Sequence, residues 1–177
     1  MCGIAGIARG KKGVVSDLLR ALKNLEYRGY DSAGIVISLD HKLLIRKGVG
    51  TIDQVLKGEL LEDGKVGIGH TRWATHGGVN VENAHPHVSC DGKIALVHNG
   101  TLDGFERLRE ELKARGHVFK SDTDTEVIVH LVEEGVEEGL DPINSLSRAL
   151  SKLGGSYAVA MIVAGMDSIF LARYTVL

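Results

Sequence analysis

The order of apolar patterns constrains the fold of this chain more than any other feature. Strand-length apolar runs open, centre and close the chain, and one block of three helical patterns lies between the later ones. Neighbouring strand runs joined by short turns favour antiparallel sheets, and helices grouped against such sheets indicate an α+β layered fold. We expect strands at residues 2–8, 34–38, 43–45, 66–71, 94–98, 157–163 and 168–173, and helices at 15–27, within 51–62, and after residues 103, 123 and 141.

Polar residues at the helix starts give cap signals of two kinds. The pairs Asp103 with Glu106 and Thr123 with Glu126 have the spacing of a capping box. The expected caps of the other helices are Ser16 or Asp17 for the first and Asp141, followed by Pro142, for the last. Residues 72–92 have no clear period, and such long loops in compact domains are usually functional.

Composition excludes several classes of partner. The 177 residues suit a single domain spanning 1–177, and the net charge of −2 favours neither nucleic acid nor an anionic membrane. No apolar run approaches the ~20 residues of a membrane span, and no secretion leader opens the chain. Two cysteines are too few for a disulfide framework, so we expect a reducing cytoplasm and a structural role for Cys90.

Cys2 is the candidate nucleophile. It follows the initiator methionine and precedes small residues, so removal of Met1 would make it the first residue. Its free α-amine, with a pKa near ~7.7–8.0, could then accept the proton of its own thiol. Taken on position alone, a small buried side chain at a strand start explains Cys2 more simply.

Three further segments could complete a site around that thiol. Arg72 offers a two-point fork for a carboxylate, and Trp73 beside it offers a rigid lid. The Asn99 amide and the Gly100 N–H could hold an oxyanion, although Asn-Gly is also an ordinary turn at a strand end. Asp124, at a helix start, could bind an ammonium. Hydrolysis of an α-amino acid with an amide side chain requires such a set of groups. The chemistry alone leaves both glutamine and asparagine open as the substrate.

Long motifs of the chain match one known family. They are Cys2-Gly3-Ile4, the segment 27–35, the HTRWATHG segment 70–77, the segment 83–87, His98-Asn99-Gly100 and the segment 121–126. Over essentially its whole length the chain resembles the glutaminase domain of glutamine–fructose-6-phosphate aminotransferase, also called glucosamine-6-phosphate synthase.

The resemblance implies a four-layer αββα sandwich of the N-terminal nucleophile hydrolase type, with Cys2 leading an inner strand. It implies that Cys2 forms a thioester with L-glutamine while Asn99 and Gly100 hold the oxyanion. Arg72 would bind the α-carboxylate, Asp124 the α-ammonium, and Thr75 and His76 would complete the pocket. Trp73 would lie on a mobile loop over the substrate. Neither a metal nor another cofactor is implied, and Arg28 and His85 receive no catalytic role.

The resemblance also implies a destination for the ammonia. In this family it travels to a sugar-isomerase domain that converts fructose 6-phosphate to glucosamine 6-phosphate. This chain is shorter than the family's glutaminase domain and carries no isomerase lobes, so we expect a sandwich that is incomplete at its C-terminus, glutamine hydrolysis without sugar amination, and a possible homo-oligomer.

Two alternatives compete with the glutaminase. One is a glutamine-binding but catalytically idle fragment, which would bind glutamine and release no ammonia. The other is a zinc site, for which a histidine-rich segment without paired cysteines is weak evidence. The histidines concerned are His70, His76, His85, His87 and His98.

Overall fold

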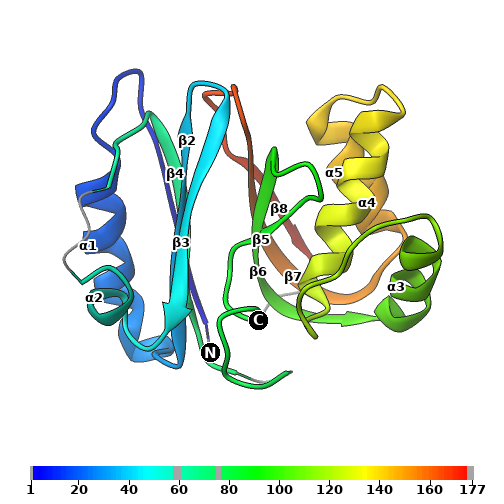
Figure 1. Cartoon of the computed structure of the whole chain (residues 1–177), viewed down its shortest axis with the longest axis horizontal. Coiled ribbons are helices and arrows are strands. Elements are labelled where there is room, and N and C mark those ends of the chain that lie inside the picture. Colours follow the sequence, from blue (N-terminus) through cyan, green and yellow to red (C-terminus); the bar gives the residue numbers. More distant parts are fainter. Residues whose placement is uncertain (1, 58–60, 75–76, 175–177) are drawn as a thin grey trace.

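Two four-stranded antiparallel sheets stacked face to face form the centre of the molecule. The computed structural model describes residues 2–57, 61–74 and 77–174. The first sheet has the order β1 (Gly3–Ala8), β4 (Val66–Arg72), β2 (Ser32–Leu39), β3 (Lys42–Val49). The second has the order β5 (His87–Val88), β6 (Ile94–Asp103), β7 (Gly154–Val163), β8 (Phe170–Tyr174). Figure 1 shows the two sheets side by side, with helices on both outer sides.

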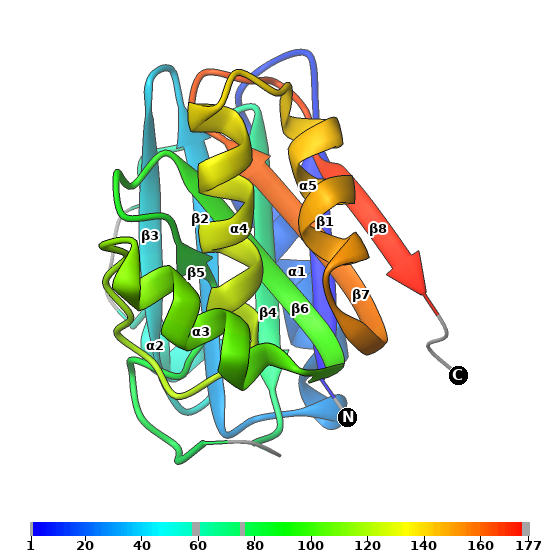
Figure 2. The ribbon, with the colours of Figure 1, turned by 90° about the vertical axis from the view of Figure 1, so that its right-hand side faces the viewer.

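The helices form the two outer layers and confirm the predicted αββα sandwich. The first sheet is covered by α1 (Val15–Leu25), α2 (Ile52–Val55) and the short 3₁₀ turn η1 (Glu26–Arg28). The second sheet is covered by α3 (Phe105–Ala114), α4 (Thr125–Glu137) and α5 (Pro142–Ser151), which Figure 2 shows lying across its strands. Within the part of the chain that the structure describes, no helix is long and apolar enough to cross a membrane.

Each pair of adjacent layers encloses its own apolar core. Leu18 and Leu22 of α1 pack against Ile35 and Ile37 of the first sheet. The helices α4 and α5 pack on the second sheet through a larger cluster that includes Ile128 and Leu131. Between the two sheets lies a third core, composed of Val36, Val66, Ile68, Ala95, Val97, Ala160 and Ile162. Successive side chains of a strand point to opposite faces of its sheet, so one face of each sheet supplies this core.

Only one of the predicted helix caps forms as expected. Asp141 caps α5 by accepting hydrogen bonds from the N–H groups of Ile143 and Asn144 at 3.0 Å. Helix α1 begins after Val14, and the Asp63 carboxylate, remote in sequence, accepts the N–H groups of Val14 and Val15, so the predicted Ser16 or Asp17 cap is wrong.

The two predicted capping boxes are also wrong. Helix α3 follows Gly104, which has a positive φ of 76°, so Asp103 is the last residue of β6 and not a cap. Helix α4 follows Asp124, and the Glu126 carboxylate accepts the backbone N–H groups of Lys120 and Ser121. Neither predicted side-chain cap is therefore formed, and Glu126 instead binds the backbone just before its helix.

Gly29 is required where the segment after η1 crosses the end of β4. A Cβ at Gly29 would lie 2.6 Å from the Arg72 carbonyl carbon and 2.7 Å from the Trp73 nitrogen. Because both atoms belong to the backbone, they cannot rotate away, and we expect Gly29→Ala to lower the free energy of unfolding by roughly 1–3 kcal/mol. Urea unfolding measures the loss. The matched control is Gly10→Ala, whose Cβ meets nothing within 4 Å; an equal effect of the two substitutions would refute the close-approach argument.

Candidate active site

Strand pairing brings Cys2 to the end of β4. Gly3, the first residue of β1, pairs with Thr71, so Cys2 lies beside Arg72 and Trp73. The Trp73 N–H donates a hydrogen bond to Cys2 Sγ at 3.3 Å, and Sγ lies 3.5 Å from the Trp73 carbonyl oxygen. These contacts fix the position of the sulfur against the backbone of Trp73. In the described sheet β1 is the edge strand, which corrects the expectation of an inner strand and leaves Cys2 half-buried.

Asn99 connects the second sheet to Cys2. Its Nδ2 donates to the Cys2 carbonyl oxygen at 3.1 Å, and its Oδ1 lies 2.8 Å from His70 Nε2. Because an amide oxygen only accepts, the His70 ring must carry its proton on Nε2. Burial lowers the pKa of His70 to about 4, so the ring is neutral at pH 7. His70 therefore holds the Asn99 amide with its NH₂ group directed toward Cys2.

Asn99 and Gly100 are not the predicted turn at a strand end. Strand β6 continues through both residues to Asp103 and keeps its pairing with β7. Gly100 has a φ of 134°, and a Cβ there would lie 2.0 Å from the Ser156 carbonyl oxygen. Only glycine fits this combination of dihedral angle and contact. The irregularity lies next to Asn99, where a departure from regular strand geometry can direct an N–H away from the ladder.

Arg72 and Asp124 supply opposite charges at the same site. Arg72 ends β4 and is buried, and its Nη1 donates to the Gly78 carbonyl oxygen at 3.2 Å. Burial lowers the pKa of Arg72, and electrostatic interactions with Cys2, Asp31 and Asp124 oppose that shift. Asp124 precedes α4, is buried, and accepts the Leu102 N–H on Oδ2 at 2.9 Å.

Two cavities meet at Cys2 and Asn99. The smaller, about 40 Å³, is polar, and its walls include Arg72, Gly100 and Asp124. The larger, about 540 Å³, is mainly apolar and extends along β1, β7 and β8. The polar cavity combines a thiol, a cation and a carboxylate, which makes it the candidate substrate site despite its size.

Trp73 and its neighbours form the outer wall of the polar cavity. The Trp73 side chain is 43% exposed and makes an edge-on contact with Tyr30, with ring centroids 5.3 Å apart. The Ala74 N–H donates to Asp31 Oδ2 at 2.9 Å, which ties the chain beyond Trp73 to the start of β2. Thr75 and His76 lie outside the described residues, so their predicted role in the pocket stays a prediction.

A buried histidine cluster, which the sequence analysis considered only as a zinc site, lies behind the cavity. Thr125 Oγ1 lies 2.9 Å from His98 Nδ1 and 3.1 Å from His85 Nε2, and His70 stacks on His85 with ring centroids 4.2 Å apart. Thr125 Oγ1 also donates to Asp124 Oδ1 at 3.3 Å. The histidines therefore orient the site through hydroxyl and amide groups, and the only signal in the sequence was their concentration in the matched motifs.

These histidines do not form the alternative zinc site. Their ring nitrogens contact Asn99 and the hydroxyls of Thr123 and Thr125. Among the residues that the structure describes, His70, His85, His87 and His98 bring no three ligand atoms together in a metal-binding group. His76, the fifth member of that hypothesis, is outside the described ranges.

Because these histidines are buried, we expect the free energy of unfolding to fall in acid. Burial lowers the pKa of His70 to about 4 and also lowers those of His85, His87 and His98. Below pH 6.5 the unfolded chain then binds more protons than the folded chain, so the free energy of unfolding falls as pH falls. His70 alone contributes a loss of about 3 kcal/mol near pH 4.5.

Urea unfolding between pH 7.5 and 4.5 measures that slope. His70→Gln, which keeps a donor and removes the titration, should show a shallower slope than the wild type. Identical slopes for the two proteins would contradict the assignment.

The sandwich and the site define an amidotransferase of the N-terminal nucleophile type, and comparison with known proteins agrees. Residues 70–176 match the family described as "Glutamine amidotransferase domain". The chain belongs to this glutamine amidotransferase family.

Two curated relatives are similar to nearly the whole of this chain. The chain is 48% identical to glutamine–fructose-6-phosphate aminotransferase [isomerizing] of Sulfolobus acidocaldarius and 49% identical to that of Thermococcus kodakarensis, over 98% of its own length in both. It spans about 30% of the length of the first and 29% of the second. The solved glutamine phosphoribosylpyrophosphate amidotransferase from B. subtilis has a TM-score of 0.81 at 29% identity, covering 98% of this chain and 37% of that one. A predicted glutamine amidotransferase from Pseudomonas aeruginosa, at 18% identity over 82% of this chain and 60% of its own, shares the fold with a TM-score of 0.54.

Proposed function

We propose that this chain is a single glutaminase domain that hydrolyses L-glutamine to glutamate and ammonia. The observation that carries the proposal is the meeting of Cys2 Sγ, the Asn99 amide, Arg72 and Asp124 at one polar cavity. We expect Met1 to be removed, which leaves the amine and the thiol of Cys2 on the same residue. Both cysteines of the described chain are free, which fits a reducing cytoplasm.

The reaction proceeds through a thioester. The α-amine of Cys2 takes the thiol proton, and Sγ attacks the side-chain amide carbon of glutamine. The oxyanion that forms accepts from the second N–H of Asn99 Nδ2 and from Gly100 N–H. The ammonium group of Cys2 returns its proton to the leaving nitrogen, and ammonia departs. Water then attacks the thioester, which frees glutamate and restores the thiol.

Arg72 and Asp124 recognise the amino acid end of the substrate. The guanidinium binds the α-carboxylate in a two-point arrangement, and the buried carboxylate of Asp124 binds the α-ammonium. Thr75 and His76 complete the pocket in this proposal. A cavity of about 40 Å³ accommodates only a water molecule or two, so glutamine must enter as the segment bearing Trp73 moves outward and then closes.

The ammonia, we propose, serves the synthesis of glucosamine 6-phosphate from fructose 6-phosphate. The names of the relatives support this step, since they are glutamine–fructose-6-phosphate aminotransferases. A sugar-isomerase domain or subunit would be the partner that consumes the ammonia.

Substrate analogues test the recognition directly. We expect ammonia release from L-glutamine and little from L-asparagine, whose amide is one methylene short of Cys2. Arg72→Lys should lower kcat/KM roughly 10²-fold or more, because a compact ammonium replaces the planar guanidinium that binds a carboxylate at two points. Asp124→Asn should act similarly on the ammonium side.

Glutamine in which the α-carboxylate is converted to an amide provides the matched control. It should be a poor substrate for the wild type, and Arg72→Lys should cost it little further activity. If the loss of kcat/KM caused by Arg72→Lys were the same for glutamine and for its α-amide, a contact between Arg72 and the carboxylate would be contradicted. Tight glutamine binding without any ammonia would instead favour the idle fragment.

A further inference from the structure

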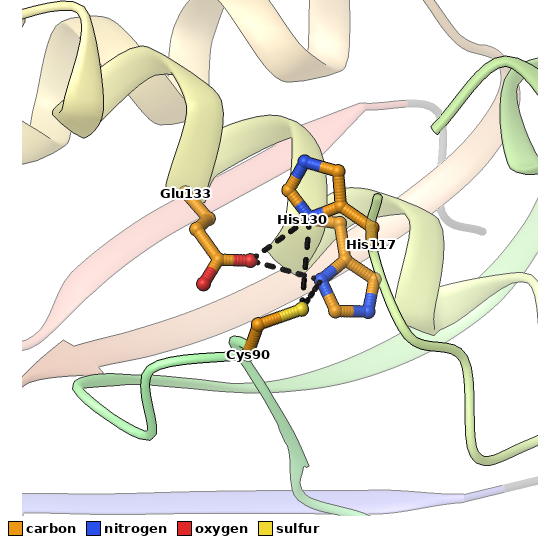
Figure 3. Close-up of side chains that lie close together, drawn as sticks. All are labelled: Cys90, His117, His130 and Glu133. Atoms are coloured by element: carbon orange, nitrogen blue, oxygen red, sulfur yellow. Dashed lines mark hydrogen bonds and ion pairs between the residues drawn. The ribbon is translucent and has the colours of Figure 1, made fainter. Parts of the chain in front are cut away.

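We propose that Cys90, His117, His130 and Glu133 form a zinc site, separate from the candidate active site. The four side chains come from three segments and point toward one another (Figure 3). Cys90 lies in the turn between β5 and β6, His117 in the connection from α3 to α4, and His130 and Glu133 on one face of α4. Their four ligand atoms all lie within 4.8 Å of one another.

The separations between ligand atoms fit a tetrahedral zinc ion. Cys90 Sγ is 3.7 Å from His117 Nδ1 and 3.6 Å from His130 Nδ1. Glu133 Oε2 is 3.1 Å from each of the same two nitrogens. With usual Zn–S, Zn–N and Zn–O bond lengths, the edges of a tetrahedron are about 3.6 Å for sulfur to nitrogen and about 3.4 Å for nitrogen to oxygen. An ion at the centre therefore requires only small adjustments.

Both histidines present their second ring nitrogen to a further carboxylate. His117 Nε2 lies 3.4 Å from Glu134 Oε1, and His130 Nε2 lies 3.9 Å from Glu126 Oε1. Histidines that bind metals usually donate their other N–H to such a group, which fixes the tautomer with the ligating nitrogen free. For His117 this arrangement leaves Nδ1, the atom that faces Cys90 and Glu133, available to a metal. His130 Nδ1 faces the same two residues, while its Nε2 is buried without a hydrogen-bond partner among the described residues.

The donor set selects a zinc-like ion. One thiolate, two neutral imidazoles and one carboxylate neutralise a divalent cation, and sulfur with nitrogen donors favours Zn²⁺ over Mg²⁺ or Ca²⁺. His130 and Glu133 are buried, whereas Cys90 is exposed and His117 half-buried, so the ion can enter from the surface. Four protein ligands leave no open position, which is typical of a structural site.

Such an ion would fasten two loops to α4. It would tie the β5–β6 turn and the α3–α4 connection to the helix whose start carries Asp124. Because the metal binds only the folded chain, saturating zinc should raise Tm by roughly 5–15 °C.

Cobalt substitution tests the proposal. We expect the chelator-stripped protein to bind one equivalent of Co²⁺, with the intense visible bands of tetrahedral coordination and a thiolate-to-cobalt band in the near ultraviolet. Zn²⁺ should displace the cobalt and abolish both bands. Elemental analysis of the protein after dialysis against zinc should give one equivalent.

Variants of the proposed ligands, each compared with a control variant, test which residues hold the metal. Cys90→Ser and His117→Ala should lose the bands and the zinc-dependent rise in Tm, while Cys2→Ser, which removes the other thiol, and His41→Ala, at an exposed histidine, should keep both. Circular dichroism of the metal-free variants checks that they fold. Failure of the wild type to retain metal would overturn the proposal and leave the four side chains as a hydrogen-bonded cluster. Bands that follow Cys2 rather than Cys90 would overturn it equally.

Discussion

Replacing Cys2 with serine is expected to lower kcat for glutamine hydrolysis by roughly 10⁴-fold or more. A hydroxyl is a much weaker nucleophile than a thiol and gives up its proton to an amine far less readily. Cys2 is half-buried, so the substitution should change the free energy of unfolding little. The variant should still bind glutamine through Arg72 and Asp124, which separates the loss of chemistry from a loss of binding.

The measurement is steady-state ammonia release together with calorimetric glutamine binding. A second variant with one uncleaved residue before Cys2 retains the thiol and blocks the amine. It should lose activity to a similar extent if the amine is the base. Substantial turnover by either variant would contradict the proposed nucleophile and base.

Replacing Asn99 with alanine is expected to lower kcat by about 10²–10³-fold with little change in KM. Asn99 directs its NH₂ group toward Cys2 because its oxygen accepts the His70 Nε2–H at 2.8 Å. An oxyanion donor acts mainly in the transition state, so the loss should appear in kcat.

His70 then acts as a positioning residue, and a pair of substitutions tests it. His70→Leu should lower kcat by roughly 10–10²-fold, because the Asn99 amide can rotate and present its oxygen to the developing charge. His70→Gln retains an N–H donor and should recover most of that loss. A glutamine variant as impaired as the leucine variant, with both proteins folded, would show that His70 acts through packing alone.

Much of the sandwich was predictable from local patterns. Strand-length apolar runs joined by a short turn predicted β2 and β3, and the leucines at helical spacing predicted α1. Its cap was not predictable, because Asp63, which accepts the first N–H groups of α1, lies nearly fifty residues away. Helix ends that are satisfied by remote side chains leave no local signal.

The candidate site was predictable where chemistry depends on residue type. Cys2, Asn99, Arg72 and Asp124 all border the polar cavity, as the matched motifs implied. The orientation of Asn99 was not predictable, since it depends on a histidine from the facing sheet. An Asn-Gly pair resembles a turn, yet long-range pairing with β7 keeps these residues in β6.

The proposed zinc ligands escaped the sequence analysis for a related reason. Only His130 and Glu133 share a helix, and Cys90 and His117 reach them through two separate loops. The chain has no paired-cysteine spacing, which is the usual sign of zinc in a sequence. Their convergence depends on how α4 packs over β5 and β6.

Intact mass spectrometry after treatment with a glutamine-analogue electrophile tests the central claim most directly. We predict a protein that lacks Met1 and carries one covalent adduct, located at Cys2 by peptide mapping and prevented by excess L-glutamine. A processed protein without an adduct, or an adduct on Cys90 instead, would contradict the assignment of Cys2 as the nucleophile that attacks glutamine.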